Sequence, residues 1–252
     1  CGLTVDDIDC VATNDFKQEF FGNEYLVDNF IIQGREIKCY IISHHLAHCA
    51  SAYYTSPFNE AHCFSMDCSM GKLEANSLVA YGKGKKLFAE YCPGEMVGVL
   101  YGEVTEKLGL GPALHKAGTT MGLSSYGTPF DFDYQSYTDD IKHKMDVAAS
   151  VQNLFENKVL SVLNDVDQNS DNLCLSGGSF LNCNANSEVV RKSKFKQFHH
   201  FPACGDDGTA VGSALYVSHH ILGEARYDYE PQDICYTGRD YPSQTPDYNH
   251  IA

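Results

Sequence analysis

Short apolar runs and segments of helical period alternate along the chain, and this alternation restricts the fold class. Apolar runs bounded by polar residues or glycine predict buried strands over residues 8–12, 37–42, 63–66 and 172–175. Residues 77–81 and 87–91 flank the turn sequence GKGKK, which predicts a hairpin. Helical period predicts helices over residues 146–166, 179–191 and 209–222. The expected class is therefore α/β.

Composition excludes several kinds of protein. The 252 residues are 43% apolar and 20% charged, so the chain can bury one large core or two modest lobes. A net charge of −15 disfavours binding to a nucleic-acid backbone. There is no apolar run of membrane-spanning length, and the start CGLTVDDIDC lacks the features of a signal peptide. The cysteines number eleven and form no CxxC pair, which favours reduced thiols and a cytoplasmic location.

Three histidines stand close together in the segment SHHLAHCASAYY, where an apolar run ends. If Ser43 caps a helix that starts here, His44 and His48 lie on one helical face, whereas His45 points about 100° away. Two imidazoles on one face can bind a metal, as in HExxH zinc enzymes, although the glutamate of that motif is not present. Polar or core histidines without a ligand are the alternative.

A third metal ligand can come from the segment GDDG, which precedes the predicted helix at residues 209–222. Two histidines and one carboxylate form a ligand set typical of ferrous iron, and zinc or manganese is also compatible with it. The alternative is that Asp206 and Asp207 only cap the following helix.

Two further segments suggest a ligand site. The sequence LCLSGGSFLNCNAN has the order strand, glycine pair, helix, in which the backbone can approach a phosphate closely. Asp67 ends a predicted buried strand, where an acid can meet water, a metal or a reacting hydroxyl. A structural turn is the alternative explanation in both cases.

Five motifs in order resemble the O-carbamoyltransferase family of nodulation and antibiotic-tailoring enzymes. They are SHHLAHCASAYYTSPFNEA, MDCSMGK, GTTMGLSSYGTP, LCLSGGSFLNCNAN and PACGDDGTAVGSAL. The resemblance covers roughly residues 8–240. It implies the duplicated actin/sugar-kinase/chaperone fold, with two strand-rich lobes around a nucleotide cleft, similar to the tRNA-modifying ATPase that makes threonylcarbamoyl-adenosine. It also implies that ATP and carbamoyl phosphate form carbamoyl adenylate, from which the carbamoyl group passes to the hydroxyl of a small-molecule acceptor at a metal.

The resemblance assigns a role to each candidate residue. His44, His48 and Asp206 would hold a divalent metal, with Asp206 preferred to Asp207 because the family pattern is GD, a variable residue, then Gly. His45 or Asp67 would take the hydroxyl proton. The implied contacts to ATP or carbamoyl adenylate come from the two glycine-containing motifs: Ser176, Gly177, Gly178, Asn182, Asn186 and Gly208.

The chain also departs from the family pattern. Cys68 and Lys72 replace a glycine and a glutamate of the family motif DGxGE, and threonines 119 and 120 stand where relatives commonly have a lysine. The expected organisation is a large domain over residues 1–230, with lobes of roughly 1–120 and 121–230. The family's first strand is expected to be missing, and residues 231–252 are expected to lead toward an absent C-terminal adenylate-forming domain, in cis or as a partner.

Two other functions are compatible with these features. One is an ATP-dependent kinase or tRNA-modifying ATPase of the same fold, although the acidic composition argues against direct contact with tRNA. The other is a noncatalytic nucleotide-binding regulatory module, which the altered turn and the expected missing segments favour.

Overall fold

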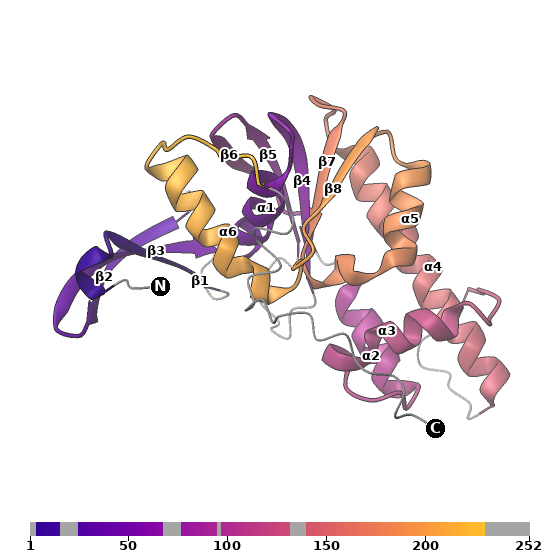
Figure 1. The fold of residues 1–252 in the computed structure, drawn as a ribbon. Helices are drawn as coiled ribbons and strands as arrows, with labels where there is room; N and C mark the ends of the chain where they lie inside the picture. The colour runs from indigo at the N-terminus through magenta and orange to yellow at the C-terminus, as the bar shows by residue number, and fades with distance from the viewer. Residues whose placement is uncertain (1–3, 16–24, 68–76, 95–96, 132–139, 230–252) are drawn as a thin grey trace, which may run out of the picture.

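The computed structural model describes residues 4–15, 25–67, 77–94, 97–131 and 140–229 (Figure 1). The expected α/β class is confirmed, because strands and helices alternate and the strands form two separate sheets. The strands are β1 (Cys10–Asp15), β2 (Tyr25–Ile32), β3 (Arg35–Ser43), β4 (Glu60–Met66), β5 (Ser77–Lys83), β6 (Lys86–Tyr91), β7 (Asn172–Ser176) and β8 (Gln197–His200). The α-helices are α1 (His44–Thr55), α2 (Gly98–Lys107), α3 (Ala113–Ser124), α4 (Ile141–Asp165), α5 (Cys183–Lys192) and α6 (Thr209–Leu215). Short helical turns are η1 (Val5–Asp7), η2 (Gly178–Leu181), η3 (Asp206–Gly208) and the π-helix η4 (Tyr216–Ile221).

The two sheets differ in size and in strand direction. The smaller sheet has the order β1-β3-β2, with β1 parallel to β3 and β2 antiparallel to it. The larger sheet has the order β6-β5-β4-β7-β8, in which an antiparallel meander of three strands adjoins the parallel strands β4, β7 and β8. In both sheets the parallel strands place their carboxyl ends at a common edge.

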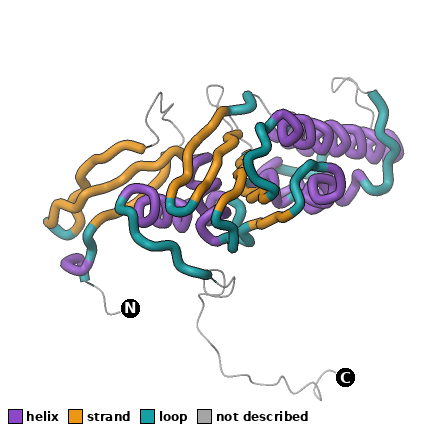
Figure 2. The backbone as a smooth tube through the Cα atoms, turned by 90° about the horizontal axis from the view of Figure 1, so that it is seen from above, coloured by secondary structure: helices purple, strands orange, loops and turns teal. Residues whose placement is uncertain are grey.

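Helices cover both faces of the larger sheet, and the alternation of side chains along β4 shows why (Figure 1). Ala61 and Cys63 belong to the apolar cluster that includes α1, whereas Phe64 and Met66 belong to the cluster that includes α4 and α5. This period of two is the pattern of a strand buried on both sides. Seen from above, much of the helical mass lies to one side of the strands (Figure 2).

Helix α1 positions the candidate site and is deeply buried. Nearly all of its side chains are buried, and most of them are small. It packs against α6 so closely that a Cβ atom on Gly212 of α6 would collide with the carbonyl oxygen of Ala47. Ser43 occupies the N-cap position as expected, but its side chain makes no capping hydrogen bond, so that part of the prediction is wrong.

The expected strands and the hairpin are present, with differences at the helices. Strand β2 and helices α2 and α3 were not predicted. The helix expected over residues 179–191 is divided into η2 and α5, and the helix expected over 209–222 is divided into α6 and η4. Helix α4 begins at Ile141, before the expected start at residue 146.

The expected division of the chain near residue 120 does not separate the two sheets. Strands on both sides of that position, β4 to β6 and β7 to β8, belong to the same five-stranded sheet. The segment after Gly223 is held against α1 by Arg226. The guanidinium of Arg226 donates to the carbonyl oxygens of Tyr53 and Ser56 at 2.9 and 3.0 Å. Among the described helices, none has the length and apolar character that crossing a membrane requires.

Candidate metal centre

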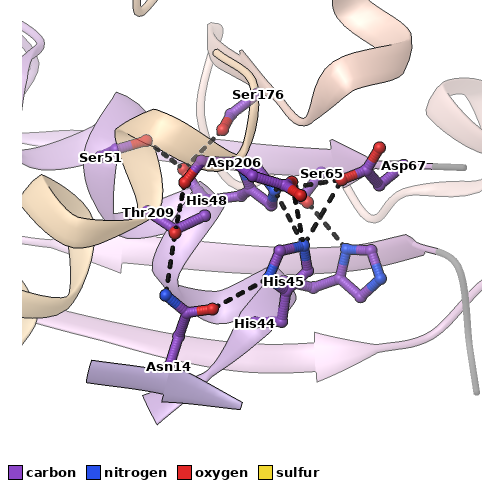
Figure 3. Close-up of polar contacts among 10 residues, drawn as sticks. All are labelled: Asn14, His44, His45, His48, Ser51, Ser65, Asp67, Ser176, Asp206 and Thr209. Atoms are coloured by element: carbon purple, nitrogen blue, oxygen red, sulfur yellow. Dashed lines mark hydrogen bonds and ion pairs between the residues drawn. The ribbon is translucent and has the colours of Figure 1, made fainter. Parts of the chain in front are cut away.

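The two predicted histidine ligands lie on one face of α1, at the edge where parallel strands end (Figure 3). His44 and His48 are 4% and 0% exposed, and their Nε2 atoms are 3.1 Å apart. Their position follows from the sequence, because α1 begins directly after β3 and two residues four apart share a helical face. Two buried imidazoles with facing nitrogens need a cation or a proton between them.

Two carboxylates complete the group. Asp206 Oδ1 lies 3.5 Å from His44 Nε2 and 3.4 Å from His48 Nε2. Asp67 Oδ2 lies 3.4 Å from each of the same two nitrogens. The sequence placed Asp67 in a catalytic role, whereas the structure brings it into the same group as the expected ligands.

The spacing of these atoms fits a metal ion. One ligand atom from each of the four residues lies within 4.8 Å of the others. Ligands about 2.1 Å from a shared ion are about 3.0 Å apart at a right angle and about 3.4 Å apart at the tetrahedral angle. The nitrogen–nitrogen and nitrogen–oxygen distances of 3.1 to 3.5 Å match these separations. Two imidazoles and two carboxylates form a donor set that suits Fe²⁺, Zn²⁺ or Mn²⁺.

The electrostatics of the group indicate mutual stabilisation of opposite charges. Burial by itself lowers the pKa of His48, but hydrogen bonds to Asp206 and Asp67 outweigh it and raise that pKa. Burial raises the pKa of Asp67, but hydrogen bonds with His44 and His48 outweigh it and hold that pKa well below its usual range. The carboxylate of Asp67 therefore remains charged at neutral pH and favours a cation.

Asp206 comes from the loop before α6 and is the exposed member of the group. Its side chain is 61% exposed, whereas that of Asp67 is 18% exposed. Residue Gly208 is the N-cap of α6, so the alternative that Asp206 serves as the cap of that helix does not hold. Asp207 is not part of the four-residue group. The choice of Asp206 over Asp207 agrees with this geometry, and metal binding stays a prediction.

His45 points away from the metal ligands. Its Nδ1 lies 3.0 Å from the hydroxyl oxygen of Ser65, and its ring centroid lies 5.4 Å from that of His44. This arrangement agrees with the expected 100° separation on the helix. His45 is thus near the group without contributing a ligand atom to it.

Several residues expected to bind the nucleotide have roles inside the protein. The hydroxyl of Ser176 donates to the carbonyl oxygen of His48 at 2.7 Å, which joins β7 to α1. Asn182 caps α5 through Ala185 N at 3.0 Å and exchanges hydrogen bonds with the amide of Gln152. The side chains of Ser176 and Asn182 are therefore occupied within the protein, and their contact with a nucleotide stays a prediction.

The expected glycines have close neighbours. Gly177 has φ 95°, which favours glycine, and its N–H donates to the carbonyl oxygen of Cys204 at 2.9 Å. A Cβ on Gly178 would lie 2.8 Å from Oδ1 of Asp67. A Cβ on Gly208 would collide with the carbonyl oxygen of Ala203, so packing requires a glycine here, and its contact with a nucleotide stays a prediction.

Asn186 differs from the other expected nucleotide contacts. Its Nδ2 donates to the carbonyl oxygen of Phe180 at 2.8 Å, whereas its Oδ1 is buried and has no partner among the described residues. Such an acceptor can receive a hydrogen bond from a ligand. Cys68 and Lys72, which depart from the family pattern, lie outside the described residues. Thr120, at the other departure, is buried and lies 2.8 Å from the hydroxyl of Thr105.

Asn14 and Thr209 also lie at the site and were not predicted from the sequence. The Oδ1 of Asn14 is 3.0 Å from Nδ1 of His44, and its Nδ2 donates to Thr209 Oγ1 at 2.8 Å. One signal could have identified Asn14, because polar residues at the carboxyl ends of neighbouring parallel strands gather at one edge. Asn14 pairs in register with Ile42, just before α1.

Comparisons with known proteins agree with the resemblance in the sequence motifs. The chain is 32% identical over 237 residues to an uncharacterised protein of Synechocystis sp., covering 75% of this chain and 38% of that protein. It is 27% identical over 303 residues to nodulation protein NolNO of Sinorhizobium fredii, covering 96% of this chain and 43% of that protein. The chain thus spans less than half the length of these relatives.

A solved structure and a family model complete the comparison. Full-length HypF in its phosphate- and nucleotide-bound form has a TM-score of 0.49 and 12% identity, covering 73% of this chain and 44% of HypF. The family model described as the carbamoyltransferase N-terminus matches residues 11–141 and 132–215. These residues make up most of the chain, which therefore belongs to the carbamoyltransferase family.

Proposed function

We propose that this chain carries the transfer site of an O-carbamoyltransferase. In this proposal a carbamoyl group passes from carbamoyl adenylate to the hydroxyl of a small-molecule acceptor: the hydroxyl oxygen bonds to the carbamoyl carbon, the bond from that carbon to the phosphate oxygen breaks, and AMP leaves. The observation that carries the proposal is the convergence of two histidine nitrogens and two carboxylate oxygens within 4.8 Å, in a chain of the carbamoyltransferase family. The carbamoyl adenylate is supplied by an adenylate-forming domain, in cis or as a partner.

The metal is held by His44, His48, Asp206 and Asp67 in this proposal. Three of these residues are those expected from the sequence, and Asp67 is added because it approaches both histidine nitrogens at 3.4 Å. The nitrogen and oxygen donors favour Fe²⁺, with Zn²⁺ and Mn²⁺ as alternatives. A bound divalent metal supplies positive charge that stabilises the negative charge formed when the hydroxyl attacks the carbamoyl carbon.

His45 is the better candidate for the proton acceptor. Asp67 has a pKa held below its usual range by hydrogen bonds that outweigh its burial, so it is a weak base at neutral pH. His45 lies on α1, the helix that carries His44 and His48, and it is not one of the four proposed ligands. The hydroxyl oxygen of Ser65 lies 3.0 Å from Nδ1 of His45 and orients its ring. We assign His45 the removal of the hydroxyl proton and Asp67 a ligand role.

In this proposal the nucleotide lies next to Gly178 and Asn186. Gly178 is next to Asp67, and the buried Oδ1 of Asn186 can accept a hydrogen bond from the nucleotide. This placement puts the phosphate of carbamoyl adenylate beside the metal ligands, where the reacting groups can be held close together.

Metal content tests the proposal directly. The chain purified without chelator is expected to contain close to one equivalent of metal by elemental analysis, and the double variant His44→Ala/His48→Ala is expected to lose it. His45→Ala serves as the matched control, because it removes an imidazole from the same helix without removing a ligand, and it should keep the metal. Undiminished metal in the double variant contradicts the assignment, as does equal loss in His45→Ala.

Calorimetry with a stable mimic of carbamoyl adenylate tests the nucleotide part. The wild-type chain with metal is expected to bind the mimic, and the double variant is expected to bind it more weakly. Failure of the metal-loaded wild-type chain to bind the mimic would remove the support for carbamoyl transfer while leaving the metal centre in place.

A further inference from the structure

Asn14 connects the two sides of the metal-ligand group, although it contributes no ligand atom. It lies on β1, His44 begins α1, and Asp206 precedes α6 (Figure 3). The Oδ1 of Asn14 is 3.0 Å from His44 Nδ1, and its Nδ2 is 2.8 Å from Thr209 Oγ1. The hydroxyl of Thr209 in turn donates to the carbonyl oxygen of Asp206 at 2.6 Å.

The direction of these hydrogen bonds can be determined from donor and acceptor chemistry. A carbonyl oxygen only accepts, so the hydroxyl hydrogen of Thr209 points to Asp206. The oxygen of Thr209 must then accept from Asn14, which places the NH₂ group of Asn14 toward Thr209. The remaining amide oxygen of Asn14 faces His44, and Nδ1 of His44 must carry a hydrogen to donate to it.

The opposite nitrogen of His44 is the one that faces the ligand group. Its Nε2 lies 3.1 Å from His48 Nε2 and 3.4 to 3.5 Å from the carboxylates. A neutral imidazole with its hydrogen on Nδ1 has its lone pair on Nε2, which is the form that binds a metal. The other neutral form would place a hydrogen where the metal belongs.

We propose that Asn14 is a positioning residue that holds His44 in the Nδ1–H form and orients Nε2 toward the metal. Through Thr209 the same amide also supports the backbone of Asp206, so one side chain aligns ligands from α1 and from the loop before α6. This inference rests on the metal centre of the proposed function and is independent of carbamoyl transfer.

The first experiment measures the hydrogen position of His44 in the metal-free full chain. Nitrogen-15 NMR of the imidazole side chains at slightly alkaline pH, assigned by comparison with His44→Ala, reports whether Nδ1 carries the hydrogen. The wild-type chain is expected to show a protonated Nδ1. Asn14→Leu removes the acceptor and is expected to shift Nδ1 toward the unprotonated signal, whereas Asn14→Asp retains an acceptor oxygen and is expected to keep the wild-type signal.

The second experiment titrates the same proteins with Co²⁺ and follows its visible absorption. Asn14→Leu is expected to weaken Co²⁺ binding by about 10- to 100-fold, the usual effect of losing a group that orients a ligand. Asn14→Asp should restore most of the affinity. Asn172→Leu is the matched control, because Asn172 donates to the carbonyl oxygen of Glu60 at 2.8 Å at the opposite end of the larger sheet, and it should bind Co²⁺ like the wild type.

The outcomes separate this inference from the proposed function. An unchanged Nδ1 signal and unchanged Co²⁺ affinity in Asn14→Leu would overturn the positioning role, even if the metal centre is real. Equal weakening in Asn172→Leu would also overturn it, because the effect would then follow from general loss of stability. If the wild-type chain binds no Co²⁺, the metal centre fails, and the NMR measurement still decides whether Asn14 sets the hydrogen position. If Asn14→Leu does not fold, the role is decided by the hydrogen position in Asn14→Asp, which retains the acceptor for His44 and must keep the wild-type Nδ1 signal.

Discussion

The carboxylate of Asp67 is confined by its neighbours on α1 and η2. It follows β4, contacts His44 and His48 on α1 at 3.4 Å, and lies against Gly178 of η2. The carbonyl oxygen of Asp67 also lies close to Gly98 at the start of α2. This confinement gives Gly178 a role in addition to the expected approach to a phosphate, because a larger residue there would displace Asp67, a proposed metal ligand.

We therefore predict that Gly178→Ala weakens metal binding. The added methyl group would lie 2.8 Å from Oδ1 of Asp67, so the carboxylate must move, and affinity for Co²⁺ is expected to fall on the order of tenfold. The fold should be retained, because the displaced atoms are the end of a flexible side chain. Calorimetric titration measures the effect.

A double-mutant cycle provides the control for this prediction. If Gly178→Ala acts through Asp67, it should have little further effect on metal affinity in an Asp67→Ala background. Additive losses would mean that Gly178 acts through some other contact, and that Asp67 is not the group displaced.

At the residue scale, the sequence predicted three members of the four-residue group, and it predicted less of what surrounds them. The spacing of His44 and His48 was readable because four residues make about one helical turn. Asp206 is far from them in the chain, and it was identified through the family motif rather than through spacing. Asn14 was not predicted, because its role depends on how β1 meets α1 and α6, which no local pattern records.

At the scale of elements, the geometry of the site depends most on the contact between α1 and α6. Helix α1 carries His44 and His48, and α6 follows Asp206, so the distance between the two helices sets the distance between the ligands. Gly212 permits the close approach, since the carbonyl oxygen of Ala47 occupies the place where a Cβ would lie.

We predict that Gly212→Ala destabilises the protein by about 1–3 kcal/mol, because the helices must separate to admit the methyl group. Gly118→Ala is the matched control: Gly118 is exposed within α3, and a Cβ there meets nothing within 4 Å. The control should be more stable than the wild type by about 0.5–1 kcal/mol, because alanine favours the helix.

Urea denaturation measures both changes on the same protein. A Gly212→Ala variant as stable as the wild type would show that α1 and α6 are not in close contact. Equal destabilisation by Gly118→Ala would show that alanine is poorly tolerated in helices of this chain in general, and not at this contact in particular.

The elements that could be predicted are those whose side chains alternate or repeat with a clear period. Strand β4 is buried on both faces and was recognisable as an apolar run. Strand β2 has exposed positions along most of its length, so its pattern was weak. Helix α3 contains glycine and threonine, which have low helix propensity, and it is held by packing against α2 and α4. The expected α/β class is confirmed by the two sheets and the helices that alternate with their strands, whereas the duplicated actin/sugar-kinase/chaperone fold stays a prediction from the motifs.

At the scale of the whole molecule, buried histidines link stability to pH. His62 on β4 is 1% exposed, and its Nε2 accepts a hydrogen bond from Asn169 N at 3.1 Å. Burial, with Lys194 nearby, lowers the pKa of His62 to about 4. His199 on β8 behaves similarly, because burial, with His200 nearby, lowers its pKa to about 4. Both side chains belong to the larger sheet and are neutral in the folded protein at neutral pH.

We predict that the free energy of unfolding decreases as the pH falls from about 6.5 to about 4. In this window the unfolded chain binds protons at these histidines and the folded protein does not, so acid favours unfolding. Above about pH 6.5 both states are neutral at these positions and the contribution is constant. Each histidine can contribute a slope of up to about 1.4 kcal/mol per pH unit.

Urea denaturation of the wild type and of His62→Gln at several pH values within this window tests the prediction. Glutamine cannot be protonated in this range, and its side-chain oxygen can replace Nε2 as the acceptor for Asn169. The stability of the wild type relative to the variant should therefore be highest at about pH 6.5 and should fall as the pH is lowered toward 4. If the difference in the free energy of unfolding between the two proteins stays constant across the window, His62 has the same pKa in the folded and unfolded states. That result would contradict the lowering of its pKa by burial.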